Sequence, residues 1–414
     1  NNVAIGNYAM DTATGGGENV AIGYEALSAV TLGENSNVAV GYGAMQNMNE
    51  GTGGGDINGN IAIGLNAFRG GSLGGTDAQV NGNIAIGMYA LDNTAAGNHL
   101  GTIAIGKNAL TAMTTGANNL AIGYEALQTN TTGHSNIAIG HNAMDDTDAG
   151  SSSLDSDHNV FIGNNVGGGT WANQKSEYNT VVGNNAFVSA LDGAMYNVGL
   201  GYRAGESLTS ADSSVIIGGI AGANITSGLR NVVIGYNAAT TLTSGDYNIY
   251  IGSDANASGA DVNDEILLAA GTGTLAGGGT ETVRIGVDSD YITNDFGENA
   301  TWTHSSDRRV KKDIKDNELG LDFINKLKTR TFKKKAPSEY PEEFDQHNPD
   351  TTERKNPDRI HYGFVAQEVK EVMDSVGHSE FPVWKENRDG MQELGETELI
   401  TTLVKSVQDL TEMV

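Results

Sequence analysis

The sequence predicts a mainly β chain: an elongated, trimeric β-solenoid or β-roll built from short repeats, followed by a small α+β domain that ends in a trimeric coiled-coil helix. Three observations predict this fold class. A short motif recurs through the first 300 residues, the composition changes near residue 300, and apolar residues near the end follow a heptad spacing. Of the 57 glycines, 52 precede residue 301, whereas all five prolines and 18 of the 24 lysines and arginines follow it.

The repeated motif is Asn-(Val/Ile)-Ala-(Ile/Val)-Gly-x-x-Ala, as in "NVAIGYEAL" at residues 19–27. Its central glycine recurs 14 times at spacings of 17 to 23 residues, so a 17-residue unit tolerates extra residues in its connecting loop. The central glycines are Gly6, Gly23, Gly41, Gly64, Gly87, Gly106, Gly123, Gly140, Gly163, Gly183, Gly201, Gly218, Gly235 and Gly252.

Each motif position has a physical interpretation. The alternation in Val20, Ala21 and Ile22 predicts a short strand with its bulky side chains inward and its alanine outward. The glycine gives the backbone freedom at a corner or allows a close approach. Asparagine, replaced twice by Thr102 and Ser214, can bond neighbouring backbone groups in a turn or a ladder.

Such short strands cannot bury an apolar face alone, so successive units must stack to make a core. A single-chain roll and an interwoven trimer both fit this requirement. An outward alanine in eight successive motifs, Ala4 to Ala138, suits close contact between identical chains, and we expect a homotrimer. After about residue 155 that position becomes larger or varied, which predicts a division into 1–155, 156–300 and 301–414. The replacements are Phe161, Val181, Gly199, Ile216, Val233 and Tyr250.

The region 301–414 has the periodicity of an ordinary globular domain. Apolar residues at helical spacing predict a first helix near 319–327, the stretch 333–359 is expected to be a loop or hairpin, and "HYGFVAQEVKEVM" at 361–373 predicts a strand that leads into a helix. The last segment has an a/d heptad pattern, which predicts a coiled coil, although a short helix packed on its own domain also fits. The heptad residues are Ile400, Leu403, Val407, Leu410 and Val414.

Charge and composition exclude several function classes. A net charge of −27 argues against binding nucleic acid or an anionic membrane surface. No apolar run is long enough to predict membrane insertion, and there is no cysteine for disulfides or thiolate metal sites. The histidines lack metal-ligand spacing and the acidic stretch 145–157 lacks the EF-hand order, so no metal or cofactor is predicted. The first residues already belong to a motif, so we expect a preceding segment.

The stretch "THSSDRRVKKDIK" at 303–315 is the chemically unusual segment. Ser306 lies five residues before Lys311, and a neutral lysine can take the proton of a serine hydroxyl and make it a nucleophile. Arg308, Arg309 and Lys312 surround the lysine with like charge, which together with burial favours the neutral form of an amine. On composition alone, a basic linker between an acidic repeat region and the next domain is the simpler interpretation.

Two resemblances sharpen these expectations. The "NVAIG" motif resembles the head repeats of trimeric autotransporter adhesins and the "AIGYxAL" repeats of phage tail fibres. The order Ser-Asp-x-Arg-x-Lys-x-x-Ile, then Gly-Phe-Val-Ala-Gln-Glu-Val, then a terminal heptad helix resembles the endosialidase-type intramolecular chaperone, a self-cleaving domain of phage tail spikes and fibres. The matching residues are Ser306, Asp307, Arg309, Lys311, Ile314, Gly363, Phe364, Val365, Ala366, Gln367, Glu368 and Val369.

The second resemblance implies a function for each part. Ser306 would be the nucleophile, Lys311 its base, and Ser305–Ser306 the bond cut once after folding; Ser305 is also a hydroxyl, which leaves a one-residue ambiguity. The chain would be a homotrimeric viral tail fibre, folded in the host cytoplasm, that contacts other tail proteins and a host receptor. Inserts at 46–58, 69–82 and 145–158 would display receptor-binding surface or be tolerated loop growth. A glycan-depolymerising tailspike enzyme and a cellular trimeric adhesin are the alternatives.

Overall fold

The structure is a computed structural model, and it describes residues 1–29, 33–49, 55–71, 78–94, 97–147, 155–171, 173–297, 299–304, 306–354 and 357–414. The chain divides into two compact units, Asn1–Ser305 and Ser306–Val414. Each is described by itself. The tips of the three long inserts lie outside the described residues, so their predicted receptor-binding role stays a prediction.

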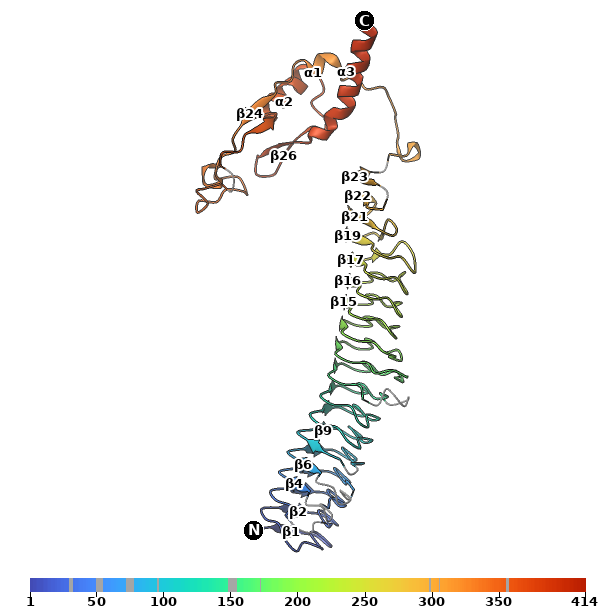
Figure 1. Cartoon of the computed structure of the whole chain (residues 1–414). Coiled ribbons are helices and arrows are strands. Elements are labelled where there is room, and N and C mark those ends of the chain that lie inside the picture. The colour runs from blue at the N-terminus through green and yellow to red at the C-terminus, as the bar shows by residue number, and fades with distance from the viewer. Residues whose placement is uncertain are drawn as a thin grey trace. The chain divides into compact units, whose positions relative to one another are not determined.

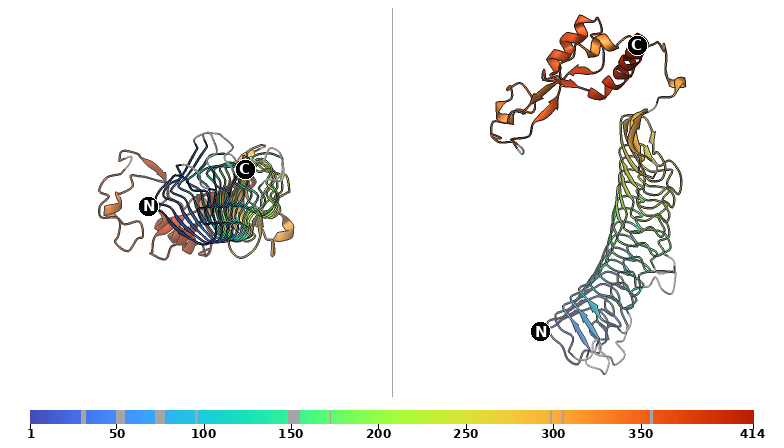
Figure 2. Two further views of the ribbon diagram at one scale, coloured as in Figure 1. Left: turned by 90° about the horizontal axis from the view of Figure 1, so that it is seen from below. Right: turned by 45° about the horizontal axis from the view of Figure 1, so that its top comes forward.

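The first unit is a β-solenoid in which each of the 14 motif copies forms one three-residue strand of a parallel sheet (Figure 1). Equivalent residues pair without slippage, as Ala121 with Ala138, so in Figure 2 the coils lie behind one another. Each coil closes within one chain, which is the roll and not the interwoven form. The motif strands are β1 (Val3–Ile5), β2 (Val20–Ile22), β3 (Val38–Val40), β5 (Ile61–Ile63), β7 (Ile84–Ile86), β9 (Ile103–Ile105), β10 (Leu120–Ile122), β11 (Ile137–Ile139), β12 (Val160–Ile162), β13 (Thr180–Val182), β14 (Val198–Leu200), β15 (Val215–Ile217), β16 (Val232–Ile234) and β17 (Ile249–Ile251).

Nine further strands complete the unit. The parallel sheet continues into β19 and β21, and the antiparallel strands β22 and β23 close its end. Two small parallel sheets, β4-β6-β8 and β18-β20, form beside it. Their bounds are β4 (Asp56–Asn58), β6 (Gln79–Asn81), β8 (His99–Leu100), β18 (Ala255–Asn256), β19 (Ile266–Ala270), β20 (Leu275–Ala276), β21 (Thr282–Val287), β22 (Asp290–Asp295) and β23 (Asn299–His304). The main sheet runs without interruption through residue 155, and the predicted division of the chain at that residue stays a prediction.

The predicted orientation of the strands is wrong. Ala21 and Ala121 are fully buried, as are the equivalent residues of the later coils such as Phe161, whereas Ile22 on the other face is 37% exposed. The alanines therefore do not form an outward face. The physical reason is the width of the coil: the residue four positions after the motif glycine, such as Leu127, is also fully buried and fills the interior opposite the strand.

In most coils the sizes of these two residues compensate for each other. Where the strand residue is alanine, the later residue is large, as in the pair Ala121 and Leu127. In most coils with a large strand residue the later one is small: Phe161 faces Gly167, and a Cβ on that glycine would lie 2.7 Å from the Phe161 ring. Val181 and Phe187 are both large, and there the next coil gives the room, because Cβ atoms on its Gly199 and Gly205 would lie 2.7 and 2.5 Å from the Phe187 ring. Exchange of size within a coil, or between neighbouring coils, accounts for the change in pattern after residue 155.

The motif glycine is required for close approach and for its backbone conformation. Gly123 has φ +140°, and a Cβ on it would lie 2.1 Å from the carbonyl oxygen of Gly140 in the next coil. Any side chain would push the coils apart, which confirms the interpretation made from the sequence.

The motif asparagines form the expected ladder in the interior. The Asn136 backbone N–H donates to Asn119 Oδ1 at 2.9 Å, and the Asn159 N–H donates to Asn136 Oδ1 at 3.0 Å. Asn136 Nδ2 also donates to the Ser156 carbonyl at 2.8 Å. Each buried amide thus satisfies backbone groups that the coil cannot pair otherwise.

The second unit is a small α+β domain. Its helices are η1 (Arg308–Val310), α1 (Leu321–Ile324), η2 (Pro337–Glu339), α2 (Ala366–Ser375), η3 (Glu396–Glu398) and α3 (Leu399–Met413), and its strands are β24 (Arg330–Phe332), β25 (His361–Gly363), β26 (Trp384–Glu386) and β27 (Gln392–Leu394). The expected strand-to-helix passage at 361–373 is confirmed, while the first helix is only one turn long. The hairpin β26-β27 was not predicted, although the Asp389-Gly390 turn between its strands is a hairpin signal.

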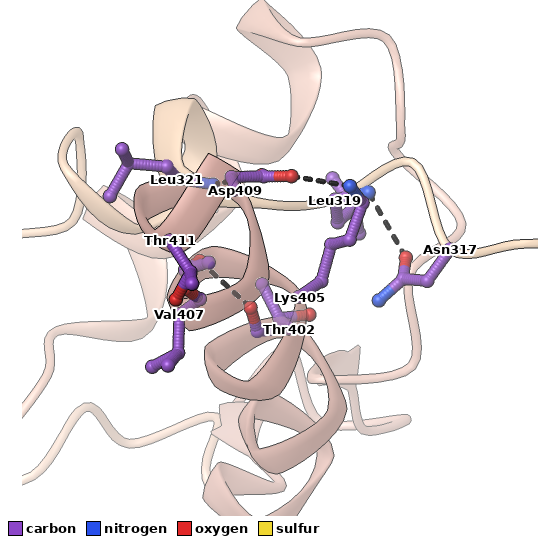
Figure 3. Close-up of polar contacts among 9 residues, drawn as sticks. Asn317, Leu319, Leu321, Thr402, Lys405, Val407, Asp409 and Thr411 are labelled. Carbon is purple, nitrogen blue, oxygen red and sulfur yellow. Dashed lines mark hydrogen bonds and ion pairs between the residues drawn. The ribbon is translucent and has the colours of Figure 1, made fainter. Parts of the chain in front are cut away.

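The core of this unit is small, and α3 packs on it through one face only. Its buried side chains are Leu319, Phe323, Val369, Met373, Val383 and Leu399. Asp409 on α3 accepts from the Leu321 N–H at 3.2 Å and pairs with Lys405 one turn away (Figure 3). The heptad residues lie on the other face of α3 and are exposed: Ile400, Leu403, Val407, Leu410 and Val414. These heptad residues, the apolar seam of α3, therefore do not pack against the helix's own domain.

Candidate functional site

The candidate site lies where the two units meet in the sequence. Strand β23 ends at His304, and the second unit begins at Ser306. Ser305, the predicted residue on the other side of the scissile bond, lies outside the described residues.

Asp307 shapes the backbone after Ser306. Its Oδ1 accepts from the Arg309 N–H at 2.8 Å and so caps the single turn η1, and the Lys311 N–H donates to the Arg308 carbonyl at 3.2 Å at the other end. An aspartate is a preferred cap because its carboxylate satisfies an N–H that the turn leaves free. Sequence reasoning placed Asp307 in the motif but missed this role, which an Asp directly before a helical turn could have indicated.

Asp307 also holds the nearest arginine. Its Oδ2 accepts from Arg309 Nη2 at 2.7 Å. The hydrogen bonds from the Arg309 side chain and backbone hold the pKa of the Asp307 carboxyl below its usual range, and the same ion pair raises the pKa of Arg309. One of the three positive charges expected to surround Lys311 is therefore paired with a carboxylate.

The turn brings the two predicted catalytic residues together. Lys311 Nζ donates to Ser306 Oγ at 2.7 Å across five residues. The two atoms therefore lie within the distance at which an uncharged lysine amine could instead accept the Ser306 O–H and act as its base. Both side chains are exposed in the single chain, as are the neighbouring Val310 (71%) and Ile314 (59%).

The downstream motif supports the fold of the second unit. Arg330 on β24 donates through Nη2 to Glu368 Oε1 at 2.6 Å, and this ion pair joins the strand pair β24-β25 to α2. The Arg330 guanidinium lowers the pKa of the Glu368 carboxyl. Val369, one residue later, is buried in the small core. Within the described part of the chain, the polar contacts of Glu368 run to β24 and not to Ser306 or Lys311.

The described residues form neither a metal-binding cluster nor a membrane-spanning helix. The described residues contain no cluster of three or more His, Asp or Glu side chains that could hold a metal ion. Among the helices formed by the described residues, none has the length and hydropathy that a membrane crossing requires.

Comparison with known proteins agrees with the geometry. Residues 306–378 match the family model described as chaperone of endosialidase, Peptidase S74. No match was found among curated proteins or among solved structures. The matched segment starts at Ser306, and it includes Lys311 and the motif on α2. The chain thus carries a C-terminal chaperone of endosialidase domain, an autoprocessing domain of the Peptidase S74 type, after a long β-solenoid.

Proposed function

We propose that this chain is a homotrimeric fibre of a viral tail that attaches to a host surface, and that its C-terminal domain assembles three chains and then removes itself. Domains of this family act as intramolecular chaperones in trimeric fibres and are typical of phage tail fibres and tailspikes. The observation that carries the proposal for this chain is the 2.7 Å hydrogen bond from Lys311 to Ser306 at the boundary of the two units.

The proposed chemistry needs only these two side chains and water. Lys311 takes the proton of the Ser306 hydroxyl, and Oγ attacks the carbonyl carbon of Ser305. The C–N bond of the peptide breaks as Lys311 returns the proton to the departing amide nitrogen, which leaves an ester between Ser305 and Ser306 Oγ. Water then hydrolyses this ester, which frees a carboxylate at 305 and restores the Ser306 hydroxyl, while the amine at 306 was already freed when the ester formed.

Assembly would control the timing of the cut. A lysine acts as a base only in its neutral form, which burial favours. Since both side chains are exposed in the single chain, we propose that neighbouring chains provide this burial when three domains associate. The exposed Val310 and Ile314 beside the pair, and the heptad seam of α3, are the apolar surfaces available for that association.

Denaturing electrophoresis with mass spectrometry of the expressed chain tests the proposal. The natural sequence should give fragments 1–305 and 306–414, whereas Ser306→Ala and Lys311→Ala should remain whole while still forming trimers. Lys315→Ala is the matched control, because it removes an exposed lysine that the proposed chemistry does not use, and it should cut normally. Cleavage of Ser306→Ala, or a first fragment that ends at residue 304, would contradict the assignment of Ser306.

A further inference from the structure

The outer face of the solenoid sheet carries two rows of aliphatic side chains. The row one residue before the motif glycine is aliphatic in all 14 coils, and the row three residues before it is aliphatic in all except Thr180. These residues point away from the filled interior. Most are partly exposed and several strongly so, as Ile63 (40%), Leu200 (47%) and Ile251 (39%) show.

This strip is large for a surface left to water. Fourteen strands about 4.8 Å apart give a length of roughly 60 Å, and two outward side chains per strand give a width of about 10 Å, hence on the order of 600 Å². The largest apolar patch on a typical monomer is about 300–600 Å². A standard interface buries about 800 Å² per partner, so the area of the strip is nearly enough to form an interface without further contacts.

The strip has the properties of a contact between copies. It carries no charged side chain, although the 300-residue repeat region contains 28 acidic residues and only six basic ones. Identical solenoids would repel each other through most other faces, whereas along this face they meet no charge. Loop lengths vary between coils, yet the two rows recur on paired strands along the whole sheet, so a copy in the same register matches them at every coil.

We propose that the copies of this chain pack against one another through the outer Val/Ile face of the solenoid sheet, with three such faces turned toward a common axis. The inference rests on the proposed trimer, and it replaces the buried alanines with the rows at Val20 and Ile22 as the contact between chains. A rotationally symmetric arrangement brings the same residue of each copy near the axis. It gives the solenoid an apolar contact separate from the seam of α3.

The absence of cysteine allows a direct test by cross-linking. A single cysteine replaces Ile217 on the outer face. The background is the Ser306→Ala chain, which should not cut itself if the proposed function is correct. The control is Ser227→Cys, because Ser227 is exposed and lies ten residues further along a coil of 17 residues. Treatment with a short bismaleimide should join most Ile217→Cys chains into covalent dimers within the trimer, with at least tenfold less product from Ser227→Cys.

Native mass measurement separates the possible failures. A trimer in which Ile217→Cys cross-links no better than Ser227→Cys would overturn the proposed face and leave the trimer standing. A monomeric chain would contradict both the face and the proposed assembly. Cross-linking in a natural-sequence chain that never cuts would sustain the face and refute the autoproteolysis. Ile217→Asp provides a second readout: it should reduce the trimer fraction, whereas Ser227→Asp should leave it unchanged.

Discussion

The two units of this chain are stabilised in different ways. The solenoid has a continuous core formed by 14 similar coils. Each coil pairs with its neighbours through its strand and its asparagine, and the motif glycine allows the coils to lie close together. The C-terminal unit of 109 residues has a core cluster of six buried apolar side chains and exposes the apolar seam of its last helix. The difference fits the proposal that the solenoid is the lasting structure and that the second unit serves association.

This division of labour fits a chaperone that is later removed. Bringing three chains into register is slow, because the chains lose conformational entropy before the contacts between them form and offset that loss. In the proposal, the small second unit associates first through its last helix and so shortens this step. Once it has been cut off, the remaining trimer could not retrace the path, so its persistence would be kinetic.

The largest expected effect comes from charging the seam of α3. Leu403→Asp combined with Val407→Asp should abolish the trimer in a Ser306→Ala chain, because three like charges per position would lie within an apolar coiled coil. Native mass measurement gives the fraction of trimer. Gln408→Asp is the control, since Gln408 is exposed and outside the heptad pattern, and it should assemble normally. Trimers in the double variant would show that the seam is not the association surface.

The next effect concerns the constant core size of the solenoid. Ala121→Phe should lower the free energy of unfolding by about 1–3 kcal/mol through overpacking, and Leu127→Gly by about 2–5 kcal/mol through a cavity. The double variant reproduces the pair found at Phe161 and Gly167, so it should lose less than the sum by about 1 kcal/mol or more. Unfolding in guanidinium chloride measures the three values, and strict additivity would argue against compensation between the positions.

The asparagine ladder should contribute less per residue than the core. Asn136→Ala removes a buried amide and leaves the Asn159 N–H and the Ser156 carbonyl without this partner, which costs about 1–3 kcal/mol. Thr102→Asn supplies the motif residue at a coil that lacks it and should stabilise the solenoid by about 1 kcal/mol. Thermal unfolding of both variants measures the effect. Equal stability of Asn136→Ala and the natural sequence would mean that water replaces the amide.

The smallest expected effect is a pH dependence in the solenoid. Burial raises the pKa of Asp145 to about 6, above its ordinary value of 3.8. The protonated form is thus favoured in the folded state, so the stabilisation is complete below pH 3.8 and is lost as the pH rises through 6. The melting temperature of the natural sequence should therefore fall slightly between pH 5 and pH 7.5 relative to Asp145→Asn. A parallel pH response of both chains would show that Asp145 does not titrate in this range.

The sequence indicated the repeated coils, the ladder and the Ser306–Lys311 pair because each depends on residues close in the motif or in the chain. It did not indicate which strand face lies inside. Ala21 and Ile22 fit either orientation until the size of Leu27 on the opposite wall is known. The exchange of large and small residues between Phe161 and Gly167 was visible in the sequence, but only a knowledge of which positions face each other gives it meaning.

The site was predictable in its residues and less so in its support. Asp307 appeared in the motif, yet its role as cap follows from the turn that it starts. In the proposed mechanism the burial of Lys311 comes from other copies of the chain, and a single sequence does not specify how they surround it.

Refolding tests the central claim most directly. The whole Ser306→Ala chain and the isolated fragment 1–305 are unfolded in guanidinium chloride, diluted at equal concentration, and weighed by native mass spectrometry. If the second unit assembles the fibre, the whole chain should return to trimers, while fragment 1–305 should give monomers or aggregates. Equal recovery of trimers from the fragment alone would contradict the account.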